Sequence, residues 1–232
     1  MFSESRALAA RMAQAARELQ DEIDPHSTMQ AAVRLATSNV RGCDAAGIAI
    51  LRRSGSLETP AYTDEVVLAV DELQECLREG PCVQSAWEDR VVHSGDLAGD
   101  PRWPSWGPRV ADELGVHSTL CFQLFTRADV LGTLSLYSTT RRAFDEQDRD
   151  EGLALAAHVA IAVAASQREQ QLTAALDTRT TIGQACGIVM ERYHLDAQRA
   201  FELLARISSE TNIKLRELAD TLIDTGHIPT VD

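Results

Sequence analysis

Cysteine thiols have the widest chemistry of any side chains in this 232-residue chain, because a thiolate can bind a metal or attack an electrophile. Cys76 and Cys82 flank Gly80-Pro81, and His93 follows nearby, which leaves a metal or thiol sensor as one alternative. Their spacing fits no established zinc pattern. An odd total of five cysteines, with no Cys-x-x-Cys, argues against a disulfide framework. We therefore expect buried structural cysteines and no metal site.

Two tryptophans, Trp103 and Trp106, follow a loop rich in glycine and proline. Rings of this size either line a pocket or pack against a sheet, and packing is the interpretation we favour. If the N-terminal part of the chain holds a small-molecule pocket, its candidate residues are Cys82, Trp103 and Cys121.

The sequence carries no catalytic constellation. It has no Gly-x-Ser-x-Gly, no phosphate-binding Gly-x-x-x-x-Gly-Lys-Ser/Thr and no His-Glu-x-x-His. No cofactor is evident, and we expect that the protein is not an enzyme. A hydrophobic content of 44% excludes wholesale disorder. A net charge of −13 excludes a basic footprint over the whole surface, but an acidic protein can still bind RNA through a local patch.

Two glycines, Gly183 and Gly187, lie four residues apart in an amphipathic helix predicted from about Thr180 to Tyr193. Each glycine costs a helix about 1 kcal/mol relative to alanine. Their presence indicates that something approaches the helix backbone closely. The alternatives are a packed helix and a nucleic-acid backbone or base.

Several cations lie near the ends of the C-terminal helices, where they could converge on phosphates. A second predicted helix carries the alternating charges of a solvated, salt-bridged face, in which we include Glu202, Arg206 and Glu210. The better candidates for phosphate contacts are Arg192, Arg199, Lys214 and Arg216.

Hydrophobic periodicity divides the chain into parts of different fold class. An N-terminal helix occupies residues 1–22. Residues 23–165 mix helices with strands, including a hairpin over 119–138, which indicates an α+β sandwich with an antiparallel sheet. Residues 178–232 contain three short helices and no strand, which indicates an all-α bundle.

A very long helix is predicted from Asp145 to about Asp177. Its first half is apolar enough to cover the sheet. Its second half is polar except for Leu172 and Leu176, which are too few to bury within a monomer. We therefore interpret residues 166–177 as a coiled-coil linker, and expect a homodimer through the helix of residues 145–177.

The C-terminal motifs resemble the ANTAR domain, an RNA-binding module of bacterial antitermination regulators. The resemblance implies a dimer that binds paired RNA hairpins in a nascent transcript and prevents formation of the overlapping terminator stem. It implies contacts from Gln184, Ala185, Gly187 and Met190, with Arg192, Lys214 and Arg216 nearby. The family usually has lysine where this chain has Cys186, which falls on the apolar stripe of its helix. The motifs are Ile182-Gly-Gln-Ala-Cys-Gly-Ile-Val-Met190, Ala200-Phe-Glu-Leu-Leu and Asn212-Ile-Lys-Leu-Arg216.

The N-terminal motifs are similar to the GAF domain. This resemblance implies a PAS-like antiparallel sheet with helices on its faces, used as a sensor of a small-molecule or protein signal. The motifs are Arg41-Gly-Cys-Asp-Ala-Ala-Gly-Ile-Ala-Ile50, Glu79-Gly-Pro-Cys82, Asp96-Leu-Ala-Gly-Asp-Pro-Arg-Trp-Pro104 and Leu131-Gly-Thr-Leu-Ser-Leu-Tyr137.

Together, the two resemblances imply an antitermination regulator in which the sensor domain controls how the dimer binds RNA. The alternative is a sensory scaffold that binds a protein partner and has lost RNA binding, which Cys186 and the acidic charge favour. The charged N-terminus is not a signal peptide, and the longest apolar run, Leu153 to Ala165, is too short to span a membrane. We expect a cytoplasmic protein without a membrane partner.

Overall fold

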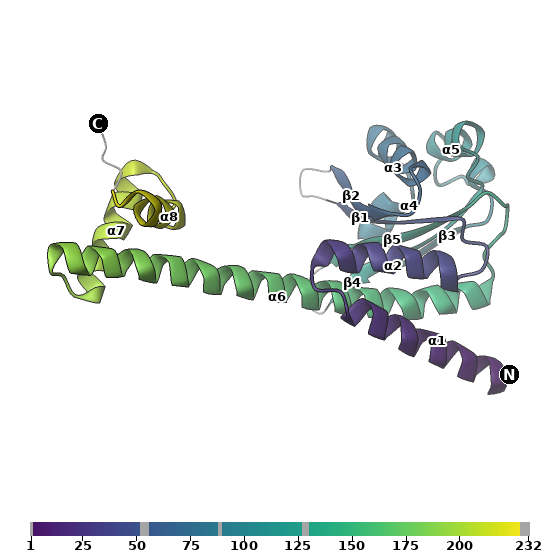
Figure 1. Ribbon diagram of the computed structural model, residues 1–232. Helices are drawn as coiled ribbons and strands as arrows, with labels where there is room; N and C mark the ends of the chain where they lie inside the picture. The colour runs from purple at the N-terminus through teal and green to yellow at the C-terminus, as the bar shows by residue number, and fades with distance from the viewer. Residues whose placement is uncertain (1, 52–55, 88–89, 127–129, 228–232) are drawn as a thin grey trace. The chain divides into compact units, whose positions relative to one another are not determined.

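The computed structural model describes residues 2–51, 56–87, 90–126 and 130–227. The chain divides into two compact units, Met1–Gln167 and Arg168–Asp232. The first unit holds a five-stranded sheet with helices on both faces, and the second is helical (Figure 1). The α+β class and the C-terminal helical bundle predicted from the sequence are confirmed.

The sheet of the first unit is antiparallel throughout, in the order β2-β1-β5-β4-β3. The predicted hairpin is present as β4 and β5, and its turn at 127–129 lies outside the described residues. Because side chains alternate along a strand, each strand contributes to two different cores. The strands are β1 (Ala45–Leu51), β2 (Leu57–Tyr62), β3 (Val91–Ser94), β4 (Ser118–Phe125) and β5 (Val130–Ser138).

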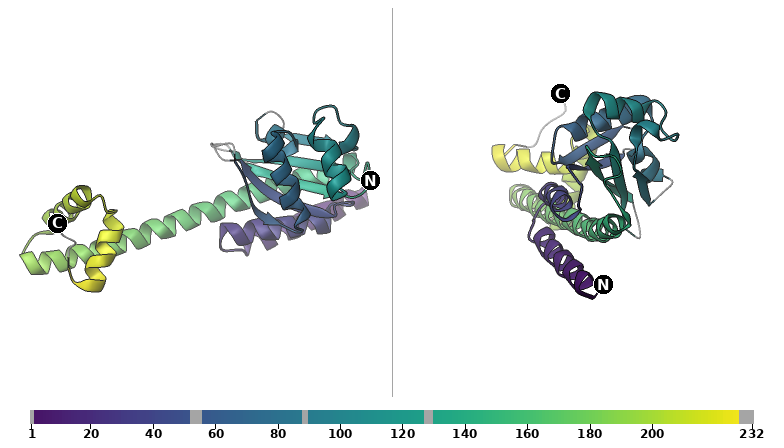
Figure 2. Two further views of the ribbon diagram at one scale, coloured as in Figure 1. Left: turned by 90° about the horizontal axis from the view of Figure 1, so that it is seen from above. Right: turned by 90° about the vertical axis from the view of Figure 1, so that its right-hand side faces the viewer.

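One face of the sheet is covered by α2 (Pro25–Asn39) and the first part of α6, with α1 (Phe2–Gln20) packed outside them (Figures 1 and 2). This core is mostly aliphatic and includes Leu120, Leu134 and Leu136 from the sheet, with the aromatic ring of Phe122. Asp24 starts α2, because its carboxylate accepts hydrogen bonds from the backbone N–H groups of the first turn.

The opposite face is covered by α3 (Val66–Leu77), α4 (Pro81–Trp87) and α5 (Trp106–Leu114), with a short 3₁₀ turn at Leu97–Gly99 (Figure 2). Sequence patterns predict neither α4 nor α5, since a Gly-Pro pair such as Gly80-Pro81 is typical of the end of a helix. Pro81 is instead the first residue of α4, a position where its missing N–H costs nothing. Trp103 and Trp106 pack edge to face at 5.4 Å, and the Trp106 Nε1 donates to Val70 O at 3.3 Å. The packing interpretation of these rings is therefore confirmed.

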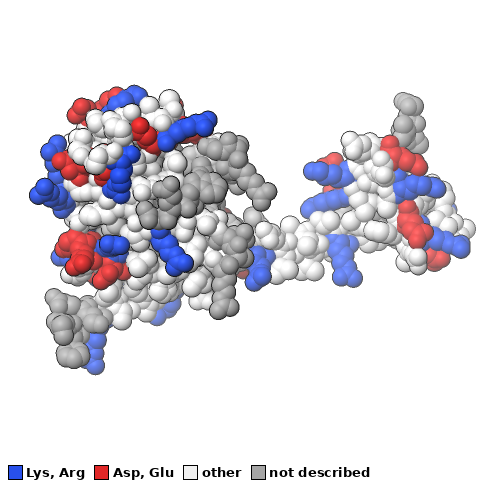
Figure 3. Space-filling view, turned by 180° about the vertical axis from the view of Figure 1, so that it is seen from behind, with Lys and Arg blue, Asp and Glu red and all other residues white. Residues whose placement is uncertain are grey.

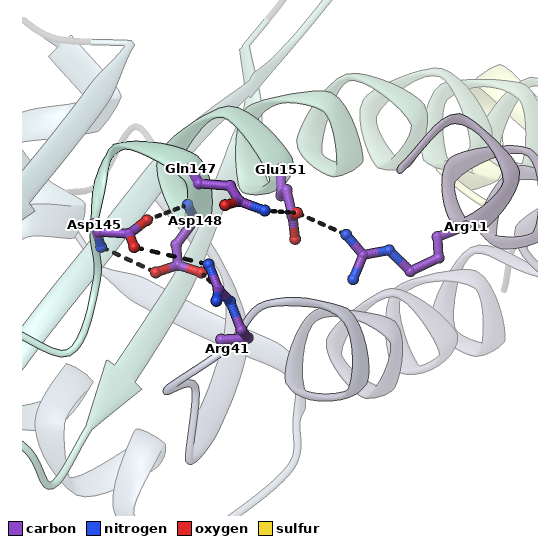
Figure 4. Close-up of polar contacts among 6 residues, drawn as sticks. All are labelled: Arg11, Arg41, Asp145, Gln147, Asp148 and Glu151. Atoms are coloured by element: carbon purple, nitrogen blue, oxygen red, sulfur yellow. Dashed lines mark hydrogen bonds and ion pairs between the residues drawn. The ribbon is translucent and has the colours of Figure 1, made fainter. Parts of the chain in front are cut away.

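Buried carboxylates hold the start of α6 against the neighbouring helices (Figure 4). Arg11 of α1 pairs with Glu151 at 2.6 Å, and the Glu151 side chain is only 2% exposed. Arg41, which follows α2, lies 3.7 Å from Asp145 and 3.6 Å from Asp148. Burial raises the pKa of Asp148, whose backbone N–H donates to Asp145. These contacts join the start of α6 to α1 and to the residue Arg41 that follows α2.

Helix α6 is continuous from Glu146 to Tyr193. The predicted break between a linker helix ending near Asp177 and a separate helix from Thr180 is therefore wrong. No glycine or proline lies there to end the helix, and the hydroxyls of Thr178 and Thr180 donate to carbonyls one turn back. The C-terminal part of α6 is thus the first helix of the bundle.

The second unit is completed by α7 (Ala197–Thr211) and α8 (Leu215–Thr225). Asp196 caps α7 through a hydrogen bond from Arg199 N at 2.9 Å, and Gly226 ends α8 in a left-handed conformation. The bundle core is apolar and small, formed by Ala185, Cys186, Val189, Ala200, Leu204, Leu218, Ala219 and Leu222.

Candidate functional sites

The two glycines of the bundle face open space. Gly183 and Gly187 are exposed, and a Cβ built on either would meet no atom of a neighbouring element within 4 Å. Close packing against another helix of this chain therefore does not explain them within the described residues. Alanine would therefore fit at both positions and would favour the helix by about 1 kcal/mol at each. The surface formed by Gly183 and Gly187 is here called the glycine face.

The residues between the glycines divide between surface and core. Gln184 is exposed and Met190 is partly buried, so both are within reach of a ligand on the bundle. Ala185 is 0% exposed and packs inside the bundle. Cys186 is 8% exposed in the same core, and burial raises the pKa of its thiol. The lysine position of the family motif is therefore a core position in this chain, which confirms the reading from periodicity.

Two of the candidate cations are engaged within the bundle. Arg192 donates from Nη1 to the carbonyl oxygen of Gly226 at 2.6 Å, so it holds the C-terminal end of α8. Arg199 lies 3.6 Å from Asp196, the residue that caps its own helix. To bind a phosphate, either of these guanidinium groups must first give up its present partner in the protein.

The other cations are differently placed. Arg216 donates to Thr178 Oγ1 at 3.1 Å and lies 3.8 Å from Asp220. Lys214 and Arg179 are exposed and form no ion pair among the described residues. The sequence analysis did not select Arg179. Its place in the predicted linker hid it, whereas the continuity of α6 puts it one turn before Gly183.

The charged surface gives no extended basic patch on the face drawn in Figure 3. Basic and acidic side chains are interspersed over the described residues of both units. On α7, Arg206 lies 3.9 Å from Glu210 and Gln198 donates to Glu202, as expected for a solvated polar face. On this face, therefore, cations are available to a polyanion only singly or in small groups.

The three residues proposed for a sensor pocket, Cys82, Trp103 and Cys121, are all buried on the α3–α5 side of the sheet. Cys82 and Cys121 are brought together, and polar side chains fill the space around them. The Cys82 Sγ lies 3.1 Å from Ser135 Oγ, and Gln74 Nε2 donates to it at 3.2 Å. Trp103 belongs to the same buried cluster as Cys121 and also lines a hollow of about 380 Å³ with Arg78 and Arg102.

A buried carboxyl completes this polar cluster. Asp71 on α3 accepts hydrogen bonds from Thr59 at 2.7 Å and Gln74 at 2.8 Å. Burial raises the pKa of Asp71 to about 6, against the opposing effect of these hydrogen bonds. Burial also raises the pKa of Tyr137, whose hydroxyl lies 3.5 Å from Asp71. The sequence analysis did not select Asp71, because its burial beneath Thr59 and Tyr137 depends on how α3 packs against the sheet.

Neither a metal cluster nor a membrane span is found in the part of the chain that the structure describes. No group of three or more His, Cys, Asp or Glu side chains there is placed to hold a metal ion. No described helix is both long and apolar enough to cross a bilayer.

Solved structures share the fold of the first unit. The GAF domain of a phosphoenolpyruvate-protein phosphotransferase from Coxiella burnetii aligns with a TM-score of 0.55 at 15% identity, covering 71% of this chain and 96% of its own. Free methionine-R-sulfoxide reductase from Neisseria meningitidis, in complex with its substrate, gives 0.55 at 16% identity and covers 71% and 93%. A domain of a sensor histidine kinase protein from Sinorhizobium meliloti gives 0.51 at 16%, covering 63% and 95%. At these identities the likeness concerns the fold alone.

The chain thus joins an α+β domain, built on an antiparallel sheet, to a helical bundle. A model of the GAF domain matches residues 22–164, and the chain belongs to this family. A model of the ANTAR domain matches residues 170–223. A GAF domain is a sensor domain and an ANTAR domain is an RNA-binding antitermination domain, so the chain is a regulatory protein of the sensing and RNA-binding kind. None of the curated proteins compared with the chain matches it.

Proposed function

We propose that this protein is a transcription antitermination regulator, in which the GAF sensor domain controls binding of a dimeric ANTAR bundle to paired hairpins in nascent RNA. Bound hairpins prevent the terminator stem from forming. The observation that carries the proposal is the glycine face, where Gly183 and Gly187 are held open at a stability cost within the matched ANTAR segment. Such a protein acts in the cytoplasm, where bacterial transcripts are made.

The glycine face supports close approach of a sugar-phosphate backbone, because no side chain keeps a ligand away from the helix. Gln184 and Met190 each lie within one helical turn of a glycine of the glycine face. They supply a polar and an apolar contact, respectively. Lys214 and Arg179 have no ion-pair partner among the described residues, so they bind phosphates without losing one. Arg216, Arg192 and Arg199 contribute only after exchanging their present partners.

Dimerisation is proposed through α6. Every residue from Arg168 to Asp177 is exposed, and Leu172 and Leu176 are 61% and 64% exposed, one turn apart on one side of the helix. Two leucines exposed to water at this spacing are accounted for by a parallel helix of a second copy. A signal in the GAF domain then acts by shifting the population of paired states.

The first test adds a side chain to the glycine face. We expect Gly187→Leu to reduce hairpin affinity about tenfold or more, because a clash in a closely packed contact forfeits at least 1.4 kcal/mol. Ser209→Leu places the same side chain at an exposed position of α7 and is the matched control. Affinity is measured by titrating a fluorescent two-hairpin RNA. Equal affinities for the two variants would remove the glycine face from the RNA contact.

The second test concerns charge. Log affinity falls as log salt concentration rises. Lys214→Ala should make this negative slope shallower by about one, the value for one lost phosphate contact. Arg206→Ala removes a cation already paired with Glu210 and should leave the slope unchanged. A slope that responds to both changes alike would show attraction to net charge rather than a defined contact.

The third test concerns the dimer. Leu172→Ser with Leu176→Ser should convert the chain to a monomer in sedimentation velocity, because the proposed contact loses its apolar pair. Ile223→Ser, at an exposed position of α8, is the control and should leave the mass unchanged. A wild-type chain that sediments as a monomer at micromolar concentration would contradict the dimer.

A second candidate function, a sensory scaffold that binds a protein partner, is favoured by one observation. Cys186 stands in the core where the family usually has a lysine, and Arg192 and Arg199 already have partners within the chain. Crosslinking the chain to RNA in cells and sequencing the bound transcripts separates the two functions. Hairpin pairs that overlap terminators support antitermination, and recovery of protein without transcripts supports the scaffold.

A further inference from the structure

The buried polar cluster of the GAF domain contains two thiols that both lie next to Ser135. Cys82, in the first turn of α4, is 1% exposed, and Cys121, in β4, is 0% exposed. The Cys82 Sγ lies 3.1 Å from Ser135 Oγ, and Ser135 is the cross-strand partner of Cys121. Directly opposed residues of an antiparallel pair lie on the same face, with Cβ atoms about 5 Å apart. The two sulfurs are therefore neighbours in the same interior space.

The surroundings of the two thiols shift their pKa values in opposite directions. Burial disfavours a thiolate at Cys121, but hydrogen bonds from Cys82, Ser135 and Thr119 outweigh burial and lower its pKa. At Cys82, the hydrogen bond with Cys121, burial and the nearby Asp71 all raise the pKa. These opposite shifts favour the thiolate at Cys121 over the thiolate at Cys82.

We propose that Cys82 and Cys121 form a redox-active dithiol, which hydrogen peroxide oxidises to a disulfide. The Cys121 sulfur attacks one peroxide oxygen, the O–O bond breaks, and the departing oxygen leaves as water, which gives a sulfenic acid at Cys121. The Cys82 sulfur then attacks the Cys121 sulfur, loses its proton and releases a second water. Two thiols and one peroxide become one disulfide and two waters, so the thiols lose two electrons and the peroxide gains them.

Access to the pair depends on α4. This helix has seven residues and is the element that lays Cys82 over the sheet. Its attachment at that end includes the hydrogen bond from Cys82 N to Gln74 Oε1 at 2.8 Å. Short helices open locally at a lower free energy than the strands beneath them, which gives a small oxidant a route to the sulfurs. A disulfide would fix α4 to β4, so oxidation changes the attachment of one cover of the sheet.

The experiment is a peptide map of the full chain after peroxide treatment. The chain is reduced, freed of reductant, exposed to hydrogen peroxide, alkylated under denaturing conditions and digested with trypsin. Each of the five cysteines falls on a separate tryptic peptide, with Cys82 in 79–90 and Cys121 in 110–127. We expect these two peptides to become linked, with loss of two hydrogen masses, and to separate again with dithiothreitol. Exposed Cys76, in 54–78, reports that the oxidant was active.

Two variants and an unfolded control make the result specific. Cys82→Ser should leave a sulfenic acid at Cys121 that dimedone labels, whereas Cys121→Ser should abolish labelling at Cys82. The map of the wild-type chain stands even if either variant fails to fold. Oxidation of Cys76 with both buried thiols still free would overturn the proposal, as would a Cys82–Cys121 link that forms only in urea. The map does not involve RNA, so it succeeds or fails independently of the proposed antitermination function.

Discussion

The two units of this chain place their reactive groups in opposite positions. The GAF domain keeps a carboxyl, a phenol and two thiols inside, at Asp71, Tyr137, Cys82 and Cys121, each 5% exposed or less. The ANTAR bundle has an almost purely apolar core and carries its distinctive residues outside, above all the glycine face. A polar interior is suited to responding to a change within the domain, and an open backbone is suited to receiving another molecule.

The two units also differ in how much stability each can lose before it unfolds. The GAF core draws on two faces of a five-stranded sheet, whereas the bundle core consists of eight small or medium side chains. Small cores give marginal stability because little surface is buried for each ordered residue. The bundle is therefore expected to be the less stable unit.

The largest expected effect is a truncation in each core. Leu204→Ala in the bundle and Leu136→Ala in the sheet each remove a side chain that is 0% exposed, at a cost of about 2–5 kcal/mol. In the bundle this loss should unfold α7 and α8, while the GAF domain should remain folded with reduced stability. Amide hydrogen exchange measures each unit separately. Protected amides in α7 and α8 of Leu204→Ala would break the contrast in stability.

The next effect concerns the buried carboxyl. Because the pKa of Asp71 is raised from 3.8 to about 6, the native state holds the proton more tightly, and stability falls as pH rises through this window. The loss approaches about 3 kcal/mol by pH 7, from about 1.4 kcal/mol per pKa unit. Asp71→Asn should remove this dependence in urea unfolding measured from pH 4 to 7.

Asp44 is the matched control of opposite sign. A hydrogen bond from the Thr139 backbone, reinforced by the side chains of Thr139 and Ser138, lowers the pKa of Asp44. Its contribution to stability is therefore present above its ordinary pKa and is lost as pH falls. Asp44→Asn should destabilise the protein at neutral pH and less so in acid. The same pH slope for both variants would contradict the assignment of Asp71 as a buried acid.

The third effect compares open and closed glycines. Gly183→Ala and Gly187→Ala should each stabilise the bundle by about 1 kcal/mol, because alanine is the better helix former and meets nothing there. Gly107→Ala in α5 should instead destabilise the GAF domain, since its Cβ would collide with the Leu97 carbonyl oxygen. Thermal unfolding of each unit gives the sign. Loss of stability in Gly187→Ala would mean that this face is not open.

The smallest effect compares two helix caps of the same type. Asp24 accepts two backbone hydrogen bonds at the start of α2, from His26 at 2.9 Å and Ser27 at 3.1 Å, whereas Asp196 accepts one at the start of α7. Each change to alanine should cost about 1 kcal/mol, with Asp24→Ala the larger. Denaturant unfolding resolves the difference, and a larger loss for Asp196→Ala would contradict the hydrogen-bond count.

Local patterns predicted the parts of the fold that depend on local physics. The β4–β5 hairpin and the core position of Cys186 both follow from alternation and periodicity. Helices α4 and α5 were missed because Gly80-Pro81 and the glycine- and proline-rich loop of residues 99–104 are typical of breaks. Pro81 nevertheless lies in the first turn of α4, where proline is tolerated. Periodicity also placed a break in α6 where no residue enforces one.

The candidate sites were less predictable because they depend on distant pairs. Cys82 and Cys121 were selected individually, but only the sheet register and the placement of α4 bring them together over Ser135. Asp71 gave no signal in the sequence, since its role comes from burial beside Thr59. Charge type alone likewise made Arg192 a phosphate ligand and did not reveal its partner 34 residues away.

Through its hydrogen bond to Gly226, Arg192 connects α6 to the C-terminal end of α8 within the bundle. Its guanidinium binds the carbonyl oxygen of Gly226, the residue that follows α8, so a phosphate that recruits Arg192 must first displace this contact at the helix end. Binding at that point would uncap α8, and part of the gain from the new ion pair would be spent on the carbonyl left behind. A transcript that engages Arg192 would therefore loosen the end of the helix it grips, whereas one that engages Lys214 would leave the bundle intact.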